Sequence, residues 1–397
     1  MTSPVPEIYL DNAATTRCDE AVAEVVRQMF LDDYGNPSSM HRKGYEAEQI
    51  VRGSSAAIAD VLGVSPEEII FTSGGTESDN LALLGCARAG KRRGMHLITT
   101  AIEHAAVAKT MEALQEEGFE VTILPVDARG IIDPGAVAEA VREDTVLVSV
   151  MAVNNEIGSV QDLKEIGRLI KAKNPAVLFH TDAVQGLGKI PIDIKGSRID
   201  LLSVSGHKFH GPKGTGILYV RKGTKIQPIL FGGGQQDGLR SGTDNVPGIA
   251  GLSKAVMMAV KGREEFAGRL TGLRDHFIQA VLENVENVRI NGPAASGDPE
   301  NTQAAPHIVS LSVPGVRAEV LLHALEDRGI YVSAGSACSS HSAKKTPGTP
   351  TLRALGLSEE CLTSTIRLSF SRETTEEELD CTVEALKEIV PALRRFQ

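Results

Sequence analysis

The segment Ser205-Gly206-His207-Lys208-Phe209-His210-Gly211-Pro212-Lys213-Gly214 decides how the rest of this chain is interpreted. It follows an apolar, strand-like run at 199–204 and leads into a glycine–proline turn. A lysine at the end of a buried strand can be desolvated and so become a nucleophile, which suits Lys208 to a Schiff base with an aldehyde cofactor. Taken alone, the segment fits a surface lysine in a polar turn equally well, so the rest of the chain must decide.

Short apolar runs alternate with helical patterns between residues 68 and 220. Runs that are apolar on both faces and separated by helices, such as those predicted at 105–117 and 163–173, are typical of a mostly parallel sheet covered on both sides. We therefore predict a large α/β domain on a sheet of seven strands. The predicted strands are 69–71, 97–99, 121–123, 146–150, 177–179, 201–204 and 217–220.

The rest of the chain predicts a smaller α+β domain. We expect a large domain at 16–255 and a small domain made of 1–15 and 256–397. A segment rich in Ser, Ala, Gly, Lys and Pro, 333–350, is interpreted as a long mobile loop of the small domain. The elements expected after residue 256 are helices at 264–284, 318–328 and 375–393 and strands at 308–313 and 365–370.

Near the N-terminus, a helix predicted at 20–32 carries an apolar stripe that is typical of ordinary core packing. The stripe consists of Val22, Val25, Val26, Met29 and Phe30.

The composition excludes several classes of protein. A net charge of -10 argues against general binding to nucleic acids or anionic membranes. Since no apolar run approaches the length of a membrane span and the first ten residues lack a basic region, we expect neither a transmembrane helix nor a signal peptide. Five cysteines without paired spacing predict reduced thiols in a cytoplasmic protein, with no disulfide framework and no metal site.

A second polar segment, Thr72-Ser73-Gly74-Gly75-Thr76-Glu77-Ser78-Asp79, follows a predicted strand and opens a helix. The backbone N–H groups at Gly75 and the hydroxyl of Thr76 could bind a phosphate, and Ser205 and His207 of the lysine segment would add donors. Asp79 lies three residues after Thr76 and suits a capping box. By itself this pattern is more typical of a well-capped helix than of a phosphate site.

Two further features follow predicted strands. Asp182 could hold a pyridine nitrogen protonated, and Gln185 could donate to a ring oxygen. His104 could stack on a flat cofactor and transfer protons near neutral pH. Individually, a capping aspartate and a structural histidine are the simpler interpretations. Together with Lys208 and the glycine segment, however, these groups fall at one end of successive strands, where open α/β sheets bind ligands, and so predict pyridoxal phosphate.

The motifs taken together resemble the cysteine desulfurases of the NifS/IscS type, within the class V aminotransferase group of fold-type-I pyridoxal-phosphate enzymes. The similarity runs nearly from end to end, and the Lys208 and Cys338 motifs are highly specific together and less specific alone. The segments that carry it are Tyr9-Leu10-Asp11-Asn12-Ala13-Ala14-Thr15-Thr16, Gly35-Asn36-Pro37-Ser38-Ser39, Gly74-Gly75-Thr76-Glu77-Ser78, Asn154-Asn155-Glu156-Ile157-Gly158, Ser205-Gly206-His207-Lys208, Arg240-Ser241-Gly242-Thr243, Gly335-Ser336-Ala337-Cys338-Ser339-Ser340 and Ile366-Arg367-Leu368-Ser369.

The resemblance implies a role for each candidate residue. Lys208 would be the Schiff-base lysine, Asp182 the partner of the ring nitrogen, and His104 the stacked acid/base. Arg367 would clamp the substrate carboxylate, for which its two-pronged guanidinium is suited. The remaining implied roles are Gln185 and Asn155 near the phenolic oxygen, Asn36 and Asn155 at the substrate, Gly75, Thr76, Ser205 and His207 at the phosphate, and Thr243 at the phosphate of a partner subunit in a homodimer.

Cys338 distinguishes desulfuration from the other class V reactions, because sulfur abstraction needs a thiolate that attacks the substrate sulfur. Its Gly and Ser neighbours argue against a core cysteine, and His341, Lys344 and Lys345 could favour the thiolate. The expected reaction converts L-cysteine to L-alanine and leaves the sulfur on Cys338 for an acceptor protein. Cys338 could also ligate an iron–sulfur cluster transiently, with a scaffold partner.

Two departures from the family pattern stand out. Arg17 occupies a position that is commonly proline, and we expect this change to be neutral. The segment 339–350 lacks the usual Glu-Pro-Ser-type stretch. The sulfur acceptor is therefore left open between an iron–sulfur scaffold and a tRNA-thiolation protein. A selenocysteine lyase or another class V lyase or aminotransferase is the alternative enzyme. A non-catalytic binding protein of the same fold is the alternative from another class.

Overall fold

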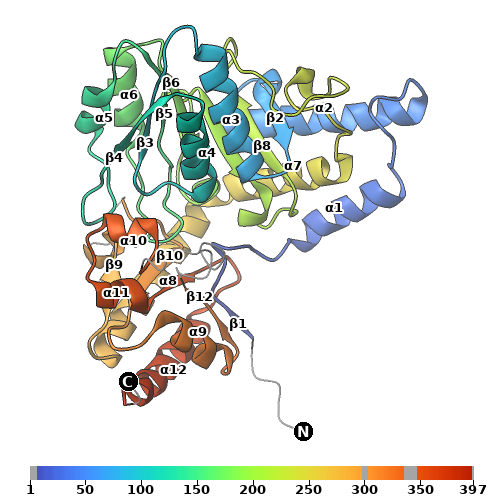
Figure 1. Ribbon diagram of the computed structural model, residues 1–397. Coiled ribbons are helices and arrows are strands. Elements are labelled where there is room, and N and C mark those ends of the chain that lie inside the picture. Colours follow the sequence, from blue (N-terminus) through green and yellow to red (C-terminus); the bar gives the residue numbers. More distant parts are fainter. Residues whose placement is uncertain (1–6, 297–302, 335–346, 396–397) are drawn as a thin grey trace.

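The large domain is built on one seven-stranded sheet. The structure, a computed structural model, describes residues 7–296, 303–334 and 347–395 (Figure 1). The sheet has the order β2-β8-β7-β6-β5-β3-β4, and β8 runs antiparallel to both of its neighbours while the other pairings are parallel. The predicted mostly parallel α/β sheet is therefore confirmed. Its strands are β2 (Ile69–Thr72), β3 (His96–Thr100), β4 (Glu120–Leu124), β5 (Thr145–Ser149), β6 (Leu178–Asp182), β7 (Leu201–Ser205) and β8 (Gly216–Val220).

Helices cover both faces of this sheet, as its uninterrupted apolar strands require. In β8, Ile217 and Tyr219 pack into one hydrophobic cluster while Leu218 and Val220 pack into another on the opposite face. The first cluster is closed by α1 (Glu20–Leu31), α2 (Arg42–Leu62), α5 (Pro134–Ala140), α6 (Leu163–Lys173) and α7 (Val246–Lys261), and the second by α3 (Gly75–Gly90) and α4 (Ala105–Glu116).

A smaller antiparallel sheet of order β12-β13-β10-β9 lies below the large one in Figure 1. Its core also contains Ile8 and Leu10 from the start of the chain, and β1 (Ile8–Tyr9) pairs with β11 (Ile330–Tyr331). The N-terminal segment is thus part of this second core. The remaining elements of this part are α8 (Arg263–Asn284), β9 (Arg289–Asn291), β10 (Ile308–Ser312), α9 (Ala318–Glu326), β12 (Ser333–Ala334), α10 (Pro350–Ala354), α11 (Glu359–Ser364), β13 (Thr365–Ser369) and α12 (Glu376–Arg394).

Short 3-10 turns complete the fold, and one of them, η2 (Gly206–Lys208), carries the lysine that opened the sequence argument. Across the described ranges, every helix is too short or too polar to span a bilayer. The other 3-10 turns are η1 (Pro66–Glu68), η3 (Gln236–Gly238) and η4 (Pro293–Ser296).

Two expectations need correction. The apolar stripe of α1 was predicted to be ordinary core, but Val22 is its buried residue, and Phe30 is 62% exposed. The segment 333–350 was predicted to be a loop throughout, but Ser333–Ala334 form β12 and Pro350 begins α10 because Thr349 caps that helix through Leu352. Residues 335–346 lie outside the described part of the chain.

Candidate active site

Lys208 lies at the carboxyl edge of the large sheet, in the tight turn η2 that follows β7. Its Nζ donates hydrogen bonds to the carbonyl oxygens of Ala13 and Ala14, both at 2.7 Å. Asn12 fixes this N-terminal segment to the small sheet, since its Nδ2 donates to the Ser369 carbonyl at 2.9 Å. The lysine therefore lies between the two halves of the molecule. This position suits a group that must contact both cofactor and substrate.

A cavity of about 370 Å³ that includes His207, the residue before Lys208, brings together the four predicted phosphate ligands. Gly74, the residue before α3, has φ 154° and ψ -177°, a backbone region that only glycine adopts readily. A side chain on Gly75 would meet Val184 Cγ2 at 2.7 Å, so at this position the backbone of Gly75 itself forms the wall of the cavity. The cavity is lined by Thr15, Ser73, Gly74, Gly75, Thr76, Glu77, Ser205, His207, Lys213 and Gly214.

The start of α3 suits an anion, because helix N-termini present free N–H groups and positive dipole ends. Gly74 has no side chain to cap this helix. The expectation that Asp79 completes a capping box is wrong: its side chain is buried, and Glu77 instead accepts from the Ser73 N–H at 2.9 Å. The helix end is thereby left open toward the cavity.

His207 contributes to this cavity as a neutral group. Burial, together with the charges of Lys208 and Lys213, lowers the pKa of His207 to about 4. Its Nδ1 lies 3.1 Å from the Thr15 hydroxyl oxygen. Lys213, a residue that the sequence argument quoted but did not assign, also lines the cavity and offers a positive charge for a phosphate.

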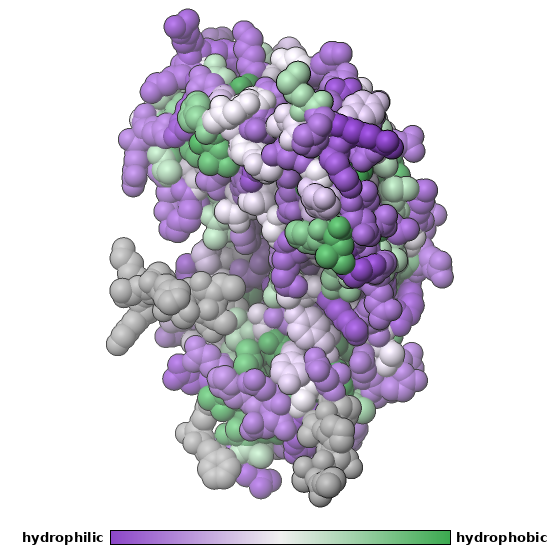
Figure 2. Space-filling model, turned by 90° about the vertical axis from the view of Figure 1, so that its right-hand side faces the viewer, coloured by the Kyte–Doolittle hydropathy of each residue, from purple (hydrophilic) through white to green (hydrophobic). Residues whose placement is uncertain are grey.

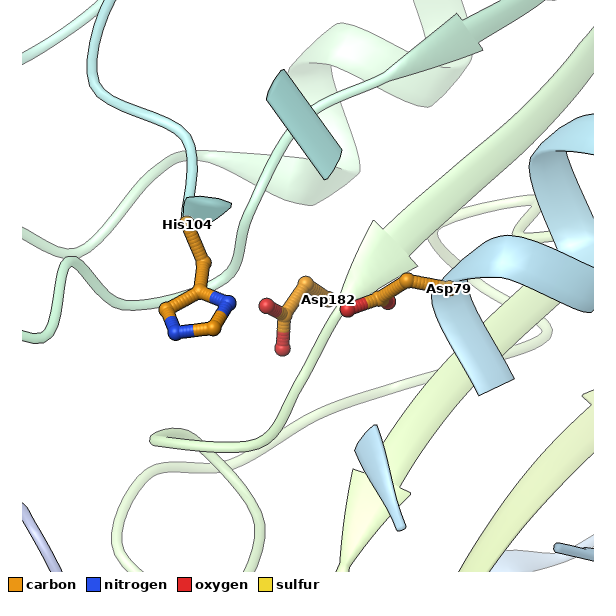
Figure 3. A group of neighbouring side chains, drawn as sticks. All are labelled: Asp79, His104 and Asp182. Atoms are coloured by element: carbon orange, nitrogen blue, oxygen red, sulfur yellow. The ribbon is translucent and has the colours of Figure 1, made fainter. Parts of the chain in front are cut away.

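Asp182 and His104 face each other at the ends of β6 and β3 (Figure 3). Asp182 is 4% exposed and accepts a hydrogen bond from the Val184 N–H at 2.8 Å. Burial raises the pKa of Asp182, and the neighbouring charges of His104 and Lys208 oppose that rise. His104 is exposed, and its Nδ1 accepts from the Ala106 N–H at 3.1 Å, so the proton of the neutral ring lies on Nε2.

Gln185 and Arg367 reach the same N-terminal segment as Lys208. Gln185 Nε2 donates to the Ala13 carbonyl at 2.8 Å, and Arg367 Nη2 lies 2.7 Å from Asp11 Oδ1. Arg367 Nη1 donates to the Asn155 carbonyl at 2.8 Å, while its buried Nε has no hydrogen-bond partner among the described residues. A buried guanidinium N–H without an acceptor is a suitable donor for a substrate carboxylate.

Two predicted site residues, Asn36 and Thr243, are not joined to this group in the described structure. Asn36 is exposed between α1 and α2, where its Oδ1 accepts from the Ser38 N–H at 2.9 Å. Thr243 is exposed in the connection that precedes α7. Cys338 lies outside the described residues.

The donor set fits pyridoxal phosphate. Residues that the sequence assigned to its phosphate line one cavity, and the aspartate for its ring nitrogen lies close to the histidine for stacking. The ligating atoms of Asp79, His104 and Asp182 lie within 4.8 Å of one another, a spacing that would also admit a metal ion, but the adjoining phosphate cradle favours the organic cofactor. The fold and this site define a pyridoxal-phosphate enzyme of fold type I.

Comparison with known proteins gives the family. Residues 8–381 match the model of the aminotransferase class-V family. A cysteine desulfurase IscS of Methanosarcina thermophila is 44% identical over 98% of this chain and 93% of its own length. Among solved structures, a NifS-like protein superposes with a TM-score of 0.90 at 40% identity, covering 98% of this chain and 100% of that one. DndA from Streptomyces lividans gives a TM-score of 0.75 at 38% identity, over 91% of this chain and 99% of that one.

The chain therefore belongs to the aminotransferase class-V family, and within it to the cysteine desulfurases of the NifS/IscS type.

The sequence argument missed several groups that the fold brings to the site. Asp11 pairs with Arg367, and Lys189 and His307 approach Gln185 Oε1, both at 3.4 Å. Glu103 was quoted beside His104 but given no role. Glu103 directly precedes His104 and Asp11 lies in the motif 9–16, but adjacency by itself does not separate a site residue from a neighbour. Lys189 and His307 lie beside no assigned residue in the sequence, so no local signal could have found them.

Proposed function

We propose that this enzyme binds L-cysteine between Lys208 and Arg367 and transfers its sulfur to Cys338. The observation that carries the proposal is that one short N-terminal segment connects the two residues. Asp11 holds the Arg367 guanidinium, and the Ala13 and Ala14 carbonyls hold the Lys208 amine. The carboxylate and the amine of one small amino acid would thus be recognised by groups that the segment positions relative to each other.

The cofactor would be held by the cavity at the start of α3, with Asp182 at its ring nitrogen, Gln185 near its phenolic oxygen and His104 against its face. When bound, pyridoxal phosphate supplies an electron sink for negative charge that develops on the substrate carbon. Lys208 would attach it covalently and, once displaced by substrate, remove the Cα proton. His104 would exchange protons with the substrate through Nε2, since Nδ1 is engaged by the Ala106 N–H.

The sulfur step would be performed by the Cys338 thiolate. It attacks the substrate sulfur, an S–S bond forms, and the C–S bond breaks with its electron pair passing to the substrate carbon. Protonation of that carbon and return of a proton to Cα complete L-alanine, and Cys338 keeps the sulfur as a persulfide. An external thiol or an acceptor protein then removes it.

The test is release of alanine from L-cysteine in excess dithiothreitol by the native protein and by Cys338→Ala. We expect alanine from the native protein alone, because dithiothreitol regenerates Cys338 but does not replace it. Equal release by both proteins would contradict transfer through Cys338 and indicate direct elimination. Lys208→Ala serves as the inactive reference, and its normal activity would contradict the whole assignment.

We also propose that the protein acts as a homodimer in the cytoplasm, with Thr243 reaching the phosphate site of the partner subunit. The side of the molecule formed by α1 and α2 exposes apolar residues among hydrophilic ones (Figure 2). A second copy would cover them. The exposed residues of this region are Phe30, Leu31, Tyr34, Met40 and Tyr45.

The boundaries of the two domains remain a proposal, with the large domain at 16–255 and the small one at 1–15 and 256–397. Separate hydrophobic cores of the two sheets support a division into two domains, while the core of the large sheet continues through Val256 along α7. The sulfur acceptor would be an iron–sulfur scaffold or a tRNA-thiolation protein. Incubation of the persulfide-loaded enzyme with each class of acceptor, followed by mass spectrometry of the acceptor cysteines, distinguishes them.

A further inference from the structure

Three buried carboxyl groups gather behind the cofactor site. Asp79 comes from α3, Glu103 from the turn before α4 and Asp182 from the end of β6, and they are 1%, 9% and 4% exposed. Figure 3 shows the carboxyl groups of Asp79 and Asp182 side by side, with the His104 ring on the far side of Asp182. The ligating atoms of Asp79 and Asp182 lie within 4.8 Å of each other. Carboxylates this close, and buried, do not all ionise.

Among the described residues, two imidazole rings lie near Asp79. The His104 ring nitrogen lies within 4.8 Å but on the far side of Asp182 (Figure 3), and His180 Nε2 lies 3.6 Å from Asp79 Oδ1. The His180 ring, however, is held between the Ser149 hydroxyl at 2.8 Å and the Ser203 hydroxyl at 3.0 Å, and burial lowers the pKa of His180 to about 3. His180 is therefore neutral and cannot compensate a charge on Asp79.

Asp79 is also poorly solvated by hydrogen bonds. Its Oδ1 is buried and has no hydrogen-bond partner among the described residues. Burial raises the pKa of Asp79 well above its usual range, the charges of Asp182 and Glu103 raise it further, and the contact with Ser203 only partly opposes them. An ionised carboxylate in these surroundings would be uncompensated.

Glu103 behaves in the same way. Its Oε1 accepts hydrogen bonds from the Thr100 hydroxyl at 2.7 Å and the Met151 N–H at 3.0 Å, but its buried Oε2 has no partner in the described structure. Burial raises the pKa of Glu103 to about 8, and the charge of Asp182 contributes to the rise. Asp182 differs from both, because it accepts from the Val184 N–H and faces His104 and Lys208.

We propose that Asp79 is a positioning residue that stays protonated behind Asp182, so that the negative charge of the three carboxyl groups lies on Asp182, where the cofactor's ring nitrogen is recognised. A second ionised carboxyl group would compete with Asp182 for the proton and the positive charge of the cofactor's ring nitrogen. The proposal rests on the assignment of Asp182 to the ring nitrogen.

The first test uses the cofactor-free protein with 13C-labelled aspartate, so its result does not depend on turnover or on the reaction assigned above. We expect the infrared carbonyl band of a protonated, isotope-shifted carboxylic acid at pH 7. The band should persist in the matched control Asp182→Asn and disappear in Asp79→Asn. A native protein without the band, or a band that survives Asp79→Asn, overturns the proposal.

The second test measures the affinity for pyridoxal phosphate. Asparagine resembles a protonated aspartate in shape and charge, so Asp79→Asn should bind the cofactor within about threefold of the native protein, whereas Asp182→Asn should bind at least about tenfold more weakly. A weakening by Asp79→Asn of more than about threefold would mean that the native Asp79 carries charge, and would overturn the proposal.

Discussion

At the scale of single residues, the site depends on a few groups whose partners come from distant parts of the chain. Arg367 is held by Asp11 and by the Asn155 carbonyl, so its guanidinium is aligned before substrate arrives. Such a fork recognises a carboxylate through two parallel hydrogen bonds, which an ammonium group cannot provide.

Arg367→Lys should therefore raise the KM for L-cysteine by about tenfold or more, with a smaller effect on kcat, because mainly substrate binding loses a hydrogen bond. Steady-state kinetics of alanine formation measure this change. Arg328→Lys, in an exposed pair with Glu388, is the matched control and should leave both constants unchanged. An unchanged KM in Arg367→Lys would remove Arg367 from the substrate site.

His180 should make the stability of the protein dependent on pH. Its pKa is lowered by burial to about 3, so the folded state binds its proton less readily than the unfolded state does. The contribution of the neutral His180 ring to the free energy of unfolding is complete above the pKa of an unfolded histidine, near 6.5. It is lost as the pH falls toward the pKa of His180 in the folded state. Between pH 6.5 and pH 5 the loss should be about 2 kcal/mol.

Urea denaturation of the cofactor-free protein at the two pH values measures this loss. His180→Gln should reduce the drop in unfolding free energy, whereas the exposed His323→Gln should not change it. If both variants lose stability to acid as the native protein does, His180 does not control the acid sensitivity.

At the scale of elements, the turn between β2 and α3 decides how closely the backbone approaches the phosphate. Gly74 has a positive φ of 154°, and a side chain there would cost about 1–3 kcal/mol of strain. Gly74→Ala should weaken the binding of pyridoxal phosphate by about tenfold or more, since relief of the strain would move the first N–H groups of α3.

Fluorescence titration of the cofactor-free protein measures this affinity. Gly268→Ala is the matched control, because a side chain at that position of α8 meets no atom within 4 Å and alanine favours a helix. Equal affinities in the two variants would mean that the turn tolerates a side chain and that α3 does not bind the phosphate.

At the scale of the whole molecule, the exposed apolar face of α1 and α2 is the feature that the single chain does not explain. Phe30→Glu should shift the protein from dimer to monomer, with the dimer dissociation constant rising by at least about tenfold, because burying a carboxylate in an apolar interface is costly. Sedimentation at several concentrations measures this, and Leu282→Glu on α8, 52% exposed in the native chain, is the control. A native protein that sediments as a monomer would contradict the dimer.

The local pattern of residues determined the strands of the large sheet and the candidate site. Its strands are apolar on both faces and separated by helices, and parallel strands end at one edge, so Lys208, Asp182, His104 and the glycine segment could be placed together from the sequence. The cofactor followed from those residues, because each supplies a chemistry that the others need, and the family followed from the resemblance of motifs along the whole chain.

Only the tertiary structure decided which neighbours these residues have. Nothing local distinguishes the buried Asp79 from a capping residue, or indicates that the stripe of α1 is buried at Val22 and exposed at Phe30, because burial depends on elements that pack from elsewhere in the chain. Asp11 and Arg367 are separated by 356 positions, and their pairing depends on the N-terminal segment crossing between the two sheets. Periodicity and spacing describe what a segment can form, while long-range packing decides what each side chain meets.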